Sequence, residues 1–232
     1  MPVKTILLLM VTGILLPAAS LRAQTQTPDI AIIGDSIFAF PLGKKISRHL
    51  QDTYDKPIAD YAVNGAVLLE KHGSRNTGSV IPRQYTSFVK RDIAGLRILI
   101  MDGGGNDVFA NERDCIENSC PALQEDISTG LDDFFATLAD DGVDHVIYLG
   151  YFGVKGFKAD LREFQDIAVD NIRSQCEGAV VDCTYVDPRA EFAARDPLER
   201  LIFLDGIHPT SAGSKVLAEM IRTELVRLDA GL

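Results

Sequence analysis

The stretch Asp29-Ile-Ala-Ile-Ile-Gly-Asp-Ser-Ile37 decides how the rest of the sequence is interpreted. Its β-branched residues are typical of a buried strand, and Gly34 ends that strand abruptly. Asp35 and Ser36 follow at once, and a helix-forming segment begins a few residues later. Open α/β sheets bind ligands at the carboxyl ends of their strands, so a serine here is well placed for chemistry. The alternative is that Asp35 and Ser36 only cap the next helix, and distant parts of the chain must decide.

Strand-like segments alternate with longer amphipathic segments along the chain. Strands are expected at 30–33, 58–63, 97–101, 145–149 and 179–186, and helices at 43–54, 83–93, 122–140, 158–176 and 211–228. Three of the strands are almost continuously apolar, as in a sheet that is covered on both faces. The alternation predicts an α/β fold in which helices wrap a parallel sheet. The long connection 102–121 is expected to be a functional loop.

Residues 1–23 have the anatomy of a secretory signal peptide, with a positive start at Lys4 and an apolar run from Ile6 to Leu16. The run is short for a membrane-spanning helix, which needs about 20 apolar residues, although an uncleaved anchor is the alternative. Residues 24–232 are expected to form one domain, exported to the periplasm or the extracellular space and not inserted in a membrane. The formal net charge of −10, without a basic stripe, argues against nucleic-acid partners.

The four cysteines fall as two close pairs, Cys115 with Cys120 and Cys176 with Cys183. Four cysteines allow three connectivities, and the two local pairings are the easiest to close in entropy. An exported chain reaches an oxidising compartment where such disulfides persist. A metal site is the alternative, but neither spacing matches a zinc knuckle and no histidine lies close in sequence.

Polar residues also follow the second and third expected strands and precede the last helix. They are Asn64-Gly65, Gly103-Gly104-Gly105-Asn106-Asp107 and Asp205-Gly206-Ile207-His208. Acyl transfer by a serine needs a base, a group that orients the base, and donors for the oxyanion. Ser36 is the candidate nucleophile, His208 the candidate base, and Asp205 the residue that orients it. The Ser36 and Gly65 amides and the Asn106 side chain are the candidate oxyanion donors.

Four of these blocks, in this order, resemble the conserved blocks of the SGNH hydrolase (GDSL esterase/lipase) family. They are Gly34-Asp35-Ser36-Ile37, Gly65, Gly104-Gly105-Asn106-Asp107 and Asp205-Gly206-Ile207-His208, and the likeness runs from Asp29 to the final helix. The chain departs from the family at Asp60, where the family often has Asn, and at Ile37, where the family name implies Leu. The resemblance implies a flavodoxin-like three-layer α/β/α sandwich with a five-stranded parallel sheet. It also implies an oxyanion hole of Ser36, Gly65 and Asn106.

The expected function is that of a serine esterase or acylhydrolase that splits small-molecule, lipid or sugar esters through an acyl-enzyme. No metal or organic cofactor is required. Carbohydrate O-deacetylase, thioesterase and lysophospholipase activities are the alternatives within the family, and a non-catalytic binding protein is the alternative outside enzymes. The substrate and the oligomeric state stay open, because a fold does not name a substrate.

Several residues have expectations of their own. Asp107 is expected to orient its loop, and His145 to be structural. His72 either lines a substrate pocket or lies in a solvated loop. The Cys115–Cys120 pair follows Asn106 in a region that borders the acyl pocket in the related fold, and is therefore expected to hold a pocket wall.

Overall fold

The computed structural model describes residues 28–40, 42–72, 77–156 and 162–229. The predicted signal peptide, residues 1–23, lies outside these ranges. All five expected strands form one sheet in the order β2-β1-β3-β4-β5, and every neighbouring pair is parallel. They are β1 (Ile30–Ile32), β2 (Ile58–Asp60), β3 (Ile98–Met101), β4 (His145–Leu149) and β5 (Asp182–Val186). This is the flavodoxin-like order, in which the direction of winding switches between β1 and β3.

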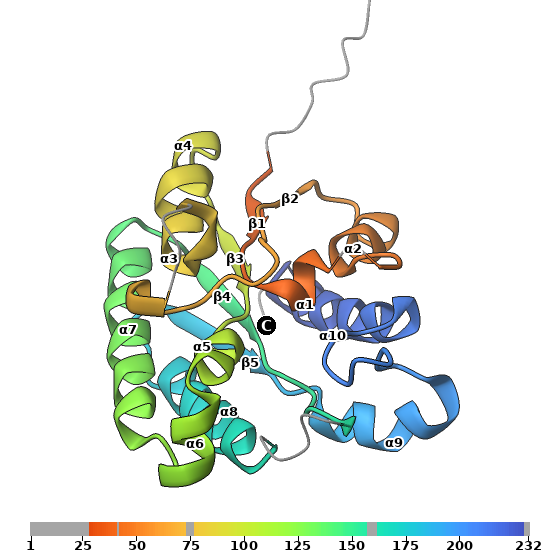
Figure 1. Cartoon of the computed structure of the whole chain (residues 1–232). Helices are drawn as coiled ribbons and strands as arrows, with labels where there is room; N and C mark the ends of the chain where they lie inside the picture. Colours follow the sequence, from red (N-terminus) through yellow and green to blue (C-terminus); the bar gives the residue numbers. More distant parts are fainter. Residues whose placement is uncertain (1–27, 41, 73–76, 157–161, 230–232) are drawn as a thin grey trace, which may run out of the picture.

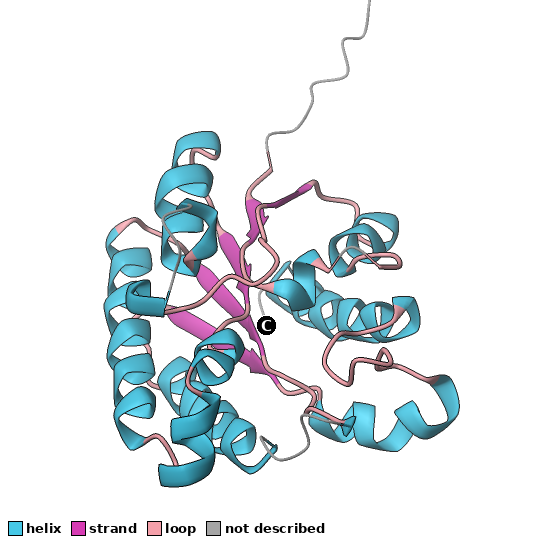
Figure 2. Ribbon diagram, in the orientation of Figure 1, coloured by secondary structure: helices cyan, strands magenta, loops and turns pink. Residues whose placement is uncertain are grey.

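Helices cover both faces of the sheet (Figures 1 and 2). The helices expected from the sequence correspond to α2 (Ile46–Thr53), α3 (Ile81–Gln84) with α4 (Lys90–Asp92), α7 (Pro121–Asp140), α8 (Arg162–Glu177) and α10 (Ser211–Asp229). A π-helical turn, Tyr85–Val89, joins α3 to α4. Short 3₁₀ turns occupy Glu70–His72 and Thr77–Ser79.

Four helices were not expected, namely α1 (Ser36–Ala39), α5 (Gly105–Ala110), α6 (Glu112–Asn118) and α9 (Arg189–Glu199). The connection 102–121, interpreted from sequence as a loop, therefore contains α5 and α6. α1, α5 and α6 have only 4, 6 and 7 residues, too few turns for a hydrophobic period to be recognised.

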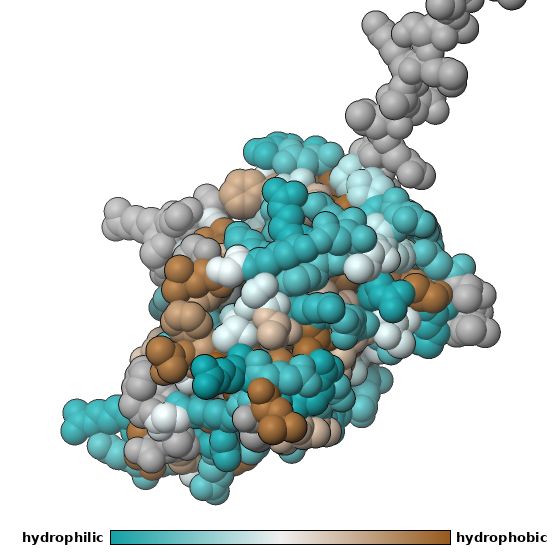
Figure 3. All heavy atoms as spheres, turned by 90° about the vertical axis from the view of Figure 1, so that its right-hand side faces the viewer, coloured by the Kyte–Doolittle hydropathy of each residue, from teal (hydrophilic) through white to brown (hydrophobic). Residues whose placement is uncertain are grey.

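Alternate residues of the strands build the two halves of the core. Ala31, Leu99 and Val146 face the layer that contains α3 and α7. Ile32, Ile100 and Ile147 face the layer that contains α2 and α10. The result is a three-layer α/β/α sandwich, as predicted. Figure 3 shows the face on the α2, α9 and α10 side, where hydrophilic side chains dominate and apolar ones are scattered.

Both predicted disulfides are confirmed. Cys115–Cys120 joins α6 to the start of α7, and Cys176–Cys183 joins the end of α8 to β5. No helix within the described ranges is both long and apolar enough to cross a membrane.

The turn that leaves β1 is fixed by buried side chains from distant parts of the chain. The Gly34 N–H donates to Gln84 Oε1 at 2.7 Å, and Gln84 Nε2 donates back to the Gly34 carbonyl at 2.9 Å. The Asp35 N–H donates to Asp102 Oδ1 at 2.7 Å. Gly34 has φ +143°, and a Cβ there would lie 1.9 Å from Asp102 Oδ1. Only glycine fits, because both the backbone conformation and the space exclude a side chain.

Asp35 and Asp102 form a pair of buried carboxyl groups beneath this turn, only 2% and 1% exposed. Burial, and then the neighbouring charge of Asp35, raise the pKa of Asp102 well above its ordinary value. Burial also raises the pKa of Asp35, but the Ile37 amide and the Tyr151 hydroxyl oppose that rise. Of the two carboxyl groups, Asp102 therefore favours the neutral form more strongly than Asp35 does.

The Asp102→Asn variant is predicted to gain stability over the wild type as pH rises. Unfolded Asp102 ionises near pH ~4 whereas folded Asp102 stays neutral, so folding takes up a proton. Above that pH this proton uptake lowers the free energy of unfolding of the wild type by about 1.4 kcal/mol per pH unit, until the pKa of folded Asp102 is reached. Asn mimics the neutral acid and takes up no proton, so the variant lacks this loss of stability. Urea unfolding of both proteins at pH 4.5, 6 and 7.5 measures the difference.

The exposed Asp52 supplies the control. Its pKa is lowered by the Lys44 ammonium group, so Asp52→Asn should show no stability advantage that grows with pH. A constant stability difference between wild type and Asp102→Asn across this pH range would contradict a neutral Asp102.

Candidate active site

Ser36 is the first residue of α1, and it lies at the carboxyl end of β1 beside the switch point of the sheet. The preceding Asp35 caps the helix, since its Oδ1 accepts the Ile37 N–H at 2.9 Å. Ser36 itself lines a small cavity together with Asn106. The capping and the catalytic interpretations of this turn are thus compatible, because Asp35 caps the helix and Ser36 faces the cavity.

Asn106, in α5 at the end of β3, lies against the segment that contains Gly65. Its Nδ2 donates to the Ala66 carbonyl at 2.8 Å, which fixes the orientation of the amide group. The other contact of Nδ2, with Asp35 Oδ2, is 3.4 Å long and therefore weak. Gly65 directly precedes Ala66 and has φ +74°. Among the described residues, the Ser36 and Gly65 amides find no protein acceptor.

Asp205 and His208 lie together in the loop before α10. His208 Nδ1 is 2.7 Å from Asp205 Oδ2, while Asp205 Oδ1 accepts the N–H groups of Ile207 at 2.9 Å and His208 at 3.0 Å. Burial alone would raise the pKa of Asp205, but the two amides and the imidazole outweigh it and lower the pKa below its ordinary value. The Asp205 carboxylate therefore stays charged, and it holds His208 with the proton on Nδ1.

The turn between Asp205 and His208 requires glycine. Gly206 has φ +75°, and a Cβ there would meet the Lys155 carbonyl oxygen at 2.2 Å. The Lys155 N–H donates to the Gly206 carbonyl at 2.8 Å. The loop after β4 thus supports the loop that presents His208.

The His208 ring stacks on Phe40, with centroids 3.8 Å apart and ring planes 2° from parallel. The Phe40 N–H donates to the Ser36 carbonyl, so the stack holds the imidazole one helical turn from Ser36. Within the described part of the chain, no hydrogen bond joins Ser36 to His208. Catalytic hydrogen bonds of unliganded enzymes often form only once substrate is bound.

The cavity beside Ser36 is a narrow slot between α1, α5 and the segment after β4. Its volume is about 20 Å³, where a single water needs roughly 10–15 Å³. A second, mainly apolar space of about 10 Å³ continues it and shares Phe109, Tyr151 and Val154 with it. The slot wall from α5 is therefore formed by Phe109. Cys115 and Cys120 line neither space, and the role expected of their disulfide, to hold a pocket wall from behind, stays a prediction.

A larger groove of about 510 Å³ adjoins the slot and shares Phe152 and Gly153 with it. Its charged lining consists of Lys155, Arg162, Asp166, Asp170 and Arg189. Hydroxyl-rich or otherwise polar groups match such a lining better than an acyl chain does, because an acyl chain would desolvate these charged side chains without offering them hydrogen bonds.

Tyr151, which sequence reasoning missed, connects the ends of three strands. Its hydroxyl donates to Asp35 Oδ2 at 2.7 Å and accepts the Gly105 N–H at 3.0 Å. Burial, followed by the charge of Asp35, raises the pKa of Tyr151 well above its ordinary value, so the hydroxyl remains a donor. The available signal was its position just after β4, at the same edge of the sheet as Ser36 and Asn106.

The remaining expectations concern Asp107 and two histidines. Asp107 orients its loop, as expected, by accepting backbone N–H groups. His72 does not lie in a solvated loop and lines neither space beside Ser36, since its side chain is 13% exposed and contacts Asp107. His145 contacts Thr184 Oγ1 at 2.8 Å, as a structural residue would. Within the described ranges, no three His, Cys, Asp or Glu side chains are arranged to hold a metal ion.

Comparisons with known proteins agree with this geometry. No curated protein matches the sequence closely enough to count as a relative. One similar solved structure is a member of the lipolytic protein G-D-S-L family from Veillonella parvula (14% identity, TM-score 0.65, covering 85% of this chain and 98% of that chain). Another is LAE5, an α/β hydrolase enzyme from the metagenome of Lake Arreo (20% identity, TM-score 0.59, covering 84% of this chain and 93% of that chain). A third is a catalytic mutant of Axe2, an acetylxylan esterase from Geobacillus stearothermophilus (18% identity, TM-score 0.58, covering 84% of this chain and 92% of that chain).

At these identities the solved structures support the fold alone. The family follows from the sequence itself, because the model of the GDSL-like Lipase/Acylhydrolase family matches residues 30–221, most of the chain. The matched region includes the turn of Ser36, the start of α5 and the loop of His208. The chain belongs to the GDSL-like lipase/acylhydrolase family, and it is a serine carboxylic ester hydrolase.

Proposed function

We propose that this protein is an exported esterase that removes short acyl groups, principally acetyl, from polar alcohols such as carbohydrates. The observation that carries the proposal is the volume of the slot beside Ser36, about 20 Å³, which suits a methyl group but no long acyl chain. The polar groove next to it offers room for a hydroxyl-rich leaving group. Two of the similar structures are of acetylxylan esterases, which supports the same substrate class.

The proposed reaction begins when His208 Nε2 takes the proton of Ser36 and the serine oxygen attacks the ester carbonyl carbon. The negative charge that develops on the carbonyl oxygen is stabilised by the amides of Ser36 and Gly65 and by Asn106 Nδ2. His208 then returns its proton to the departing alcohol oxygen, which leaves an acyl-enzyme. Water, deprotonated by His208, splits this ester and restores Ser36. Asp205 stabilises the imidazolium in both halves.

Export is part of the same proposal. A signal peptide at residues 1–23 would be removed, and 24–232 would act as one domain in the periplasm or outside the cell. Two disulfides are compatible with such a compartment. Lysophospholipase activity fits less well, since a long acyl chain would need the slot to open widely.

Replacement of Ser36 by Ala tests the function. We expect p-nitrophenyl acetate hydrolysis to fall by several powers of ten, with a melting temperature close to that of wild type. A variant that keeps more than about a tenth of kcat would exclude Ser36 as the attacking group. A wild-type protein without any activity on acetyl esters would instead favour a binding role.

The Asp205→Asn variant tests the orienting role of the carboxylate. Asn keeps an oxygen for the two backbone N–H groups but removes the charge that holds the imidazole, so kcat should fall by roughly 10²–10⁴. Asp196→Asn is the matched control, because Asp196 also accepts a backbone N–H, from Ile202, and pairs with Lys155. The control should lower stability without a comparable loss of kcat. Equal losses from both variants would count against the role of Asp205.

The acyl preference is tested with p-nitrophenyl esters from acetate to palmitate. The wild type should prefer acetate, and Phe109→Ala, which removes the α5 wall of the slot, should shift the preference toward butyrate and hexanoate. Phe88→Ala is the control, because Phe88 stacks on Tyr61 and lines neither the slot nor its extension. Wild-type activity that rises with chain length would refute the short-acyl proposal.

A further inference from the structure

Asp107, next to Asn106 in α5, fastens the segment that follows Gly65. Its Oδ2 accepts the Leu68 N–H at 2.7 Å, and its Oδ1 accepts the Leu69 N–H at 3.0 Å. The Asp107 side chain is fully buried, so these bonds are shielded from water. One carboxylate thus joins the helix that bears Asn106 to the loop that bears Gly65.

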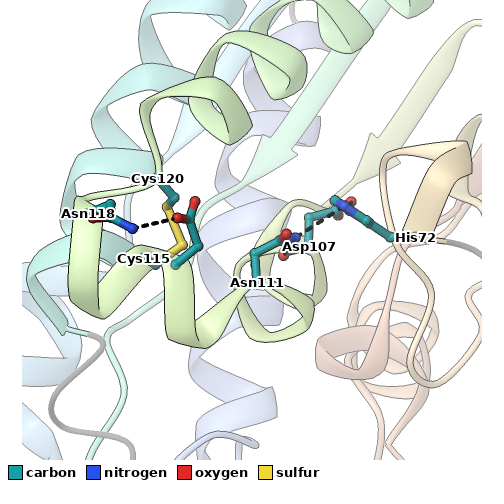
Figure 4. Close-up of a disulfide and its surroundings, with 7 residues drawn as sticks. His72, Asp107, Asn111, Cys115, Asn118 and Cys120 are labelled. Carbon is teal, nitrogen blue, oxygen red and sulfur yellow. Dashed lines mark hydrogen bonds and ion pairs between the residues drawn. A yellow bond between two sulfur atoms is a disulfide. The ribbon is translucent and has the colours of Figure 1, made fainter.

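His72, which follows Leu68 and Leu69 in the chain, also contacts the Asp107 carboxylate (Figure 4). Its Nδ1 lies 2.9 Å from Asp107 Oδ1, and its Nε2 lies 3.1 Å from Asn111 Nδ2. Asn111 Nδ2 also donates to the Asp107 carbonyl at 2.8 Å, which fixes the orientation of its amide group. The second N–H of Asn111 therefore points to Nε2, and this nitrogen accepts. The Nδ1–H of His72 therefore donates to the Asp107 carboxylate.

We propose that His72, Asp107 and Asn111 form a clamp that sets the relative positions of the two oxyanion donors on separate segments, Gly65 and Asn106. His72 is in this sense a positioning residue for the hydrolytic reaction. The inference rests on the proposed function, since it requires these donors to stabilise the oxyanion. It goes beyond that function because His72 and Asn111 lie outside the blocks that carry the family resemblance.

The clamp has a physical reason in the fold. Gly65 lies between β2 and the first 3₁₀ turn, in a segment that contributes no strand to the sheet beyond Asp60. Backbone hydrogen bonds from Val63 to the Gly34 carbonyl and from Val67 to the Ser79 carbonyl hold the chain on either side of Gly65. The Asp107 carboxylate adds the connection between this segment and the helix of Asn106. Burial raises the pKa of Asp107, while the Leu68 amide, the His72 ring and the Leu69 amide oppose that rise. Removing His72 leaves a buried carboxylate with one donor fewer and loosens its hold on the loop.

The mechanism predicts a loss in kcat rather than in substrate binding. Donors displaced by a fraction of an ångström stabilise the transition state less but scarcely contact the ground state. His72→Ala should lower kcat on p-nitrophenyl acetate by roughly 10–100-fold with KM within about twofold. His72→Asn, which can still donate from the position of Nδ1, should recover most of the loss. Asn111→Ala removes the bonds to His72 Nε2 and to the Asp107 carbonyl but leaves the contact between His72 and the Asp107 carboxylate, so it should have a smaller effect in the same direction.

His145→Ala is the matched control, because His145 is also partly buried and makes one side-chain contact, with Thr184. It should lower the melting temperature without lowering kcat. All variants are assayed well below the lowest melting temperature, so that unfolded protein does not lower the apparent kcat. A loss of kcat in His145→Ala equal to that in His72→Ala would overturn the positioning role.

A double-mutant cycle with Asn106→Ala supplies the decisive test. Asn106→Ala alone should lower kcat by roughly 10²–10³. In that background His72→Ala should lower kcat by clearly less than it does in the wild type, because one of the two donors whose relative position the clamp sets is already absent. Fully additive losses would overturn the clamp, as would unchanged kcat in His72→Ala. Unchanged kcat in Asn106→Ala itself would instead refute the oxyanion assignment within the proposed function.

Discussion

The hydrogen bond from the Asp35 amide to the buried carboxyl of Asp102 is the constraint on which the site depends. The Asp102 carboxyl group that accepts this bond fills the space that a side chain at residue 34 would need, so the position requires glycine. With the backbone held there and by Gln84, the chain leaves β1 in a direction that makes Ser36 the first residue of α1. The Asp35 side chain is then free to accept from Tyr151. One polar cluster thus ties together the ends of β1, β3 and β4, at the switch point where an open sheet binds its ligands.

This arrangement places a buried negative charge one residue from the proposed nucleophile. Asp35 is tolerated because amide and hydroxyl donors surround it and because Asp102 remains protonated. His208 lowers the pKa of Asp35 electrostatically, and the imidazole contacts the second carboxylate, Asp205, through Nδ1. The negative charge of Asp35 would also oppose an oxyanion that forms beside Ser36. The Asn106 amide, which lies against Asp35 and lines the slot, is suited to offset that opposition.

Sequence reasoning could predict the strands, the long helices and the Asp205–His208 pair, because each leaves a local signal. Strands and long helices have a period, and a carboxylate three residues before a histidine can reach its ring. The groups that hold Ser36 leave no such signal. Gln84, Asp102 and Tyr151 lie 50, 67 and 116 residues from their partners in the turn. Their roles arise only when the sheet brings the strand ends together, and the slot wall at Phe109 follows from α5, which is too short to be recognised.

The same device recurs at each segment that the sheet does not position directly. Asp35 accepts the amide of Ile37, Asp205 accepts two consecutive amides in its loop, and Asp107 accepts two consecutive amides across the gap between two segments. Aspartate suits this task because its side chain is short and its two oxygens can accept several N–H groups in a fixed geometry. Loop ends have fewer regular backbone partners than a strand or helix, and in this site carboxylates add acceptors for their N–H groups. The proposed donors and the proposed base are thereby held in place without substrate, which is the condition under which electrostatic stabilisation of a transition state is most effective.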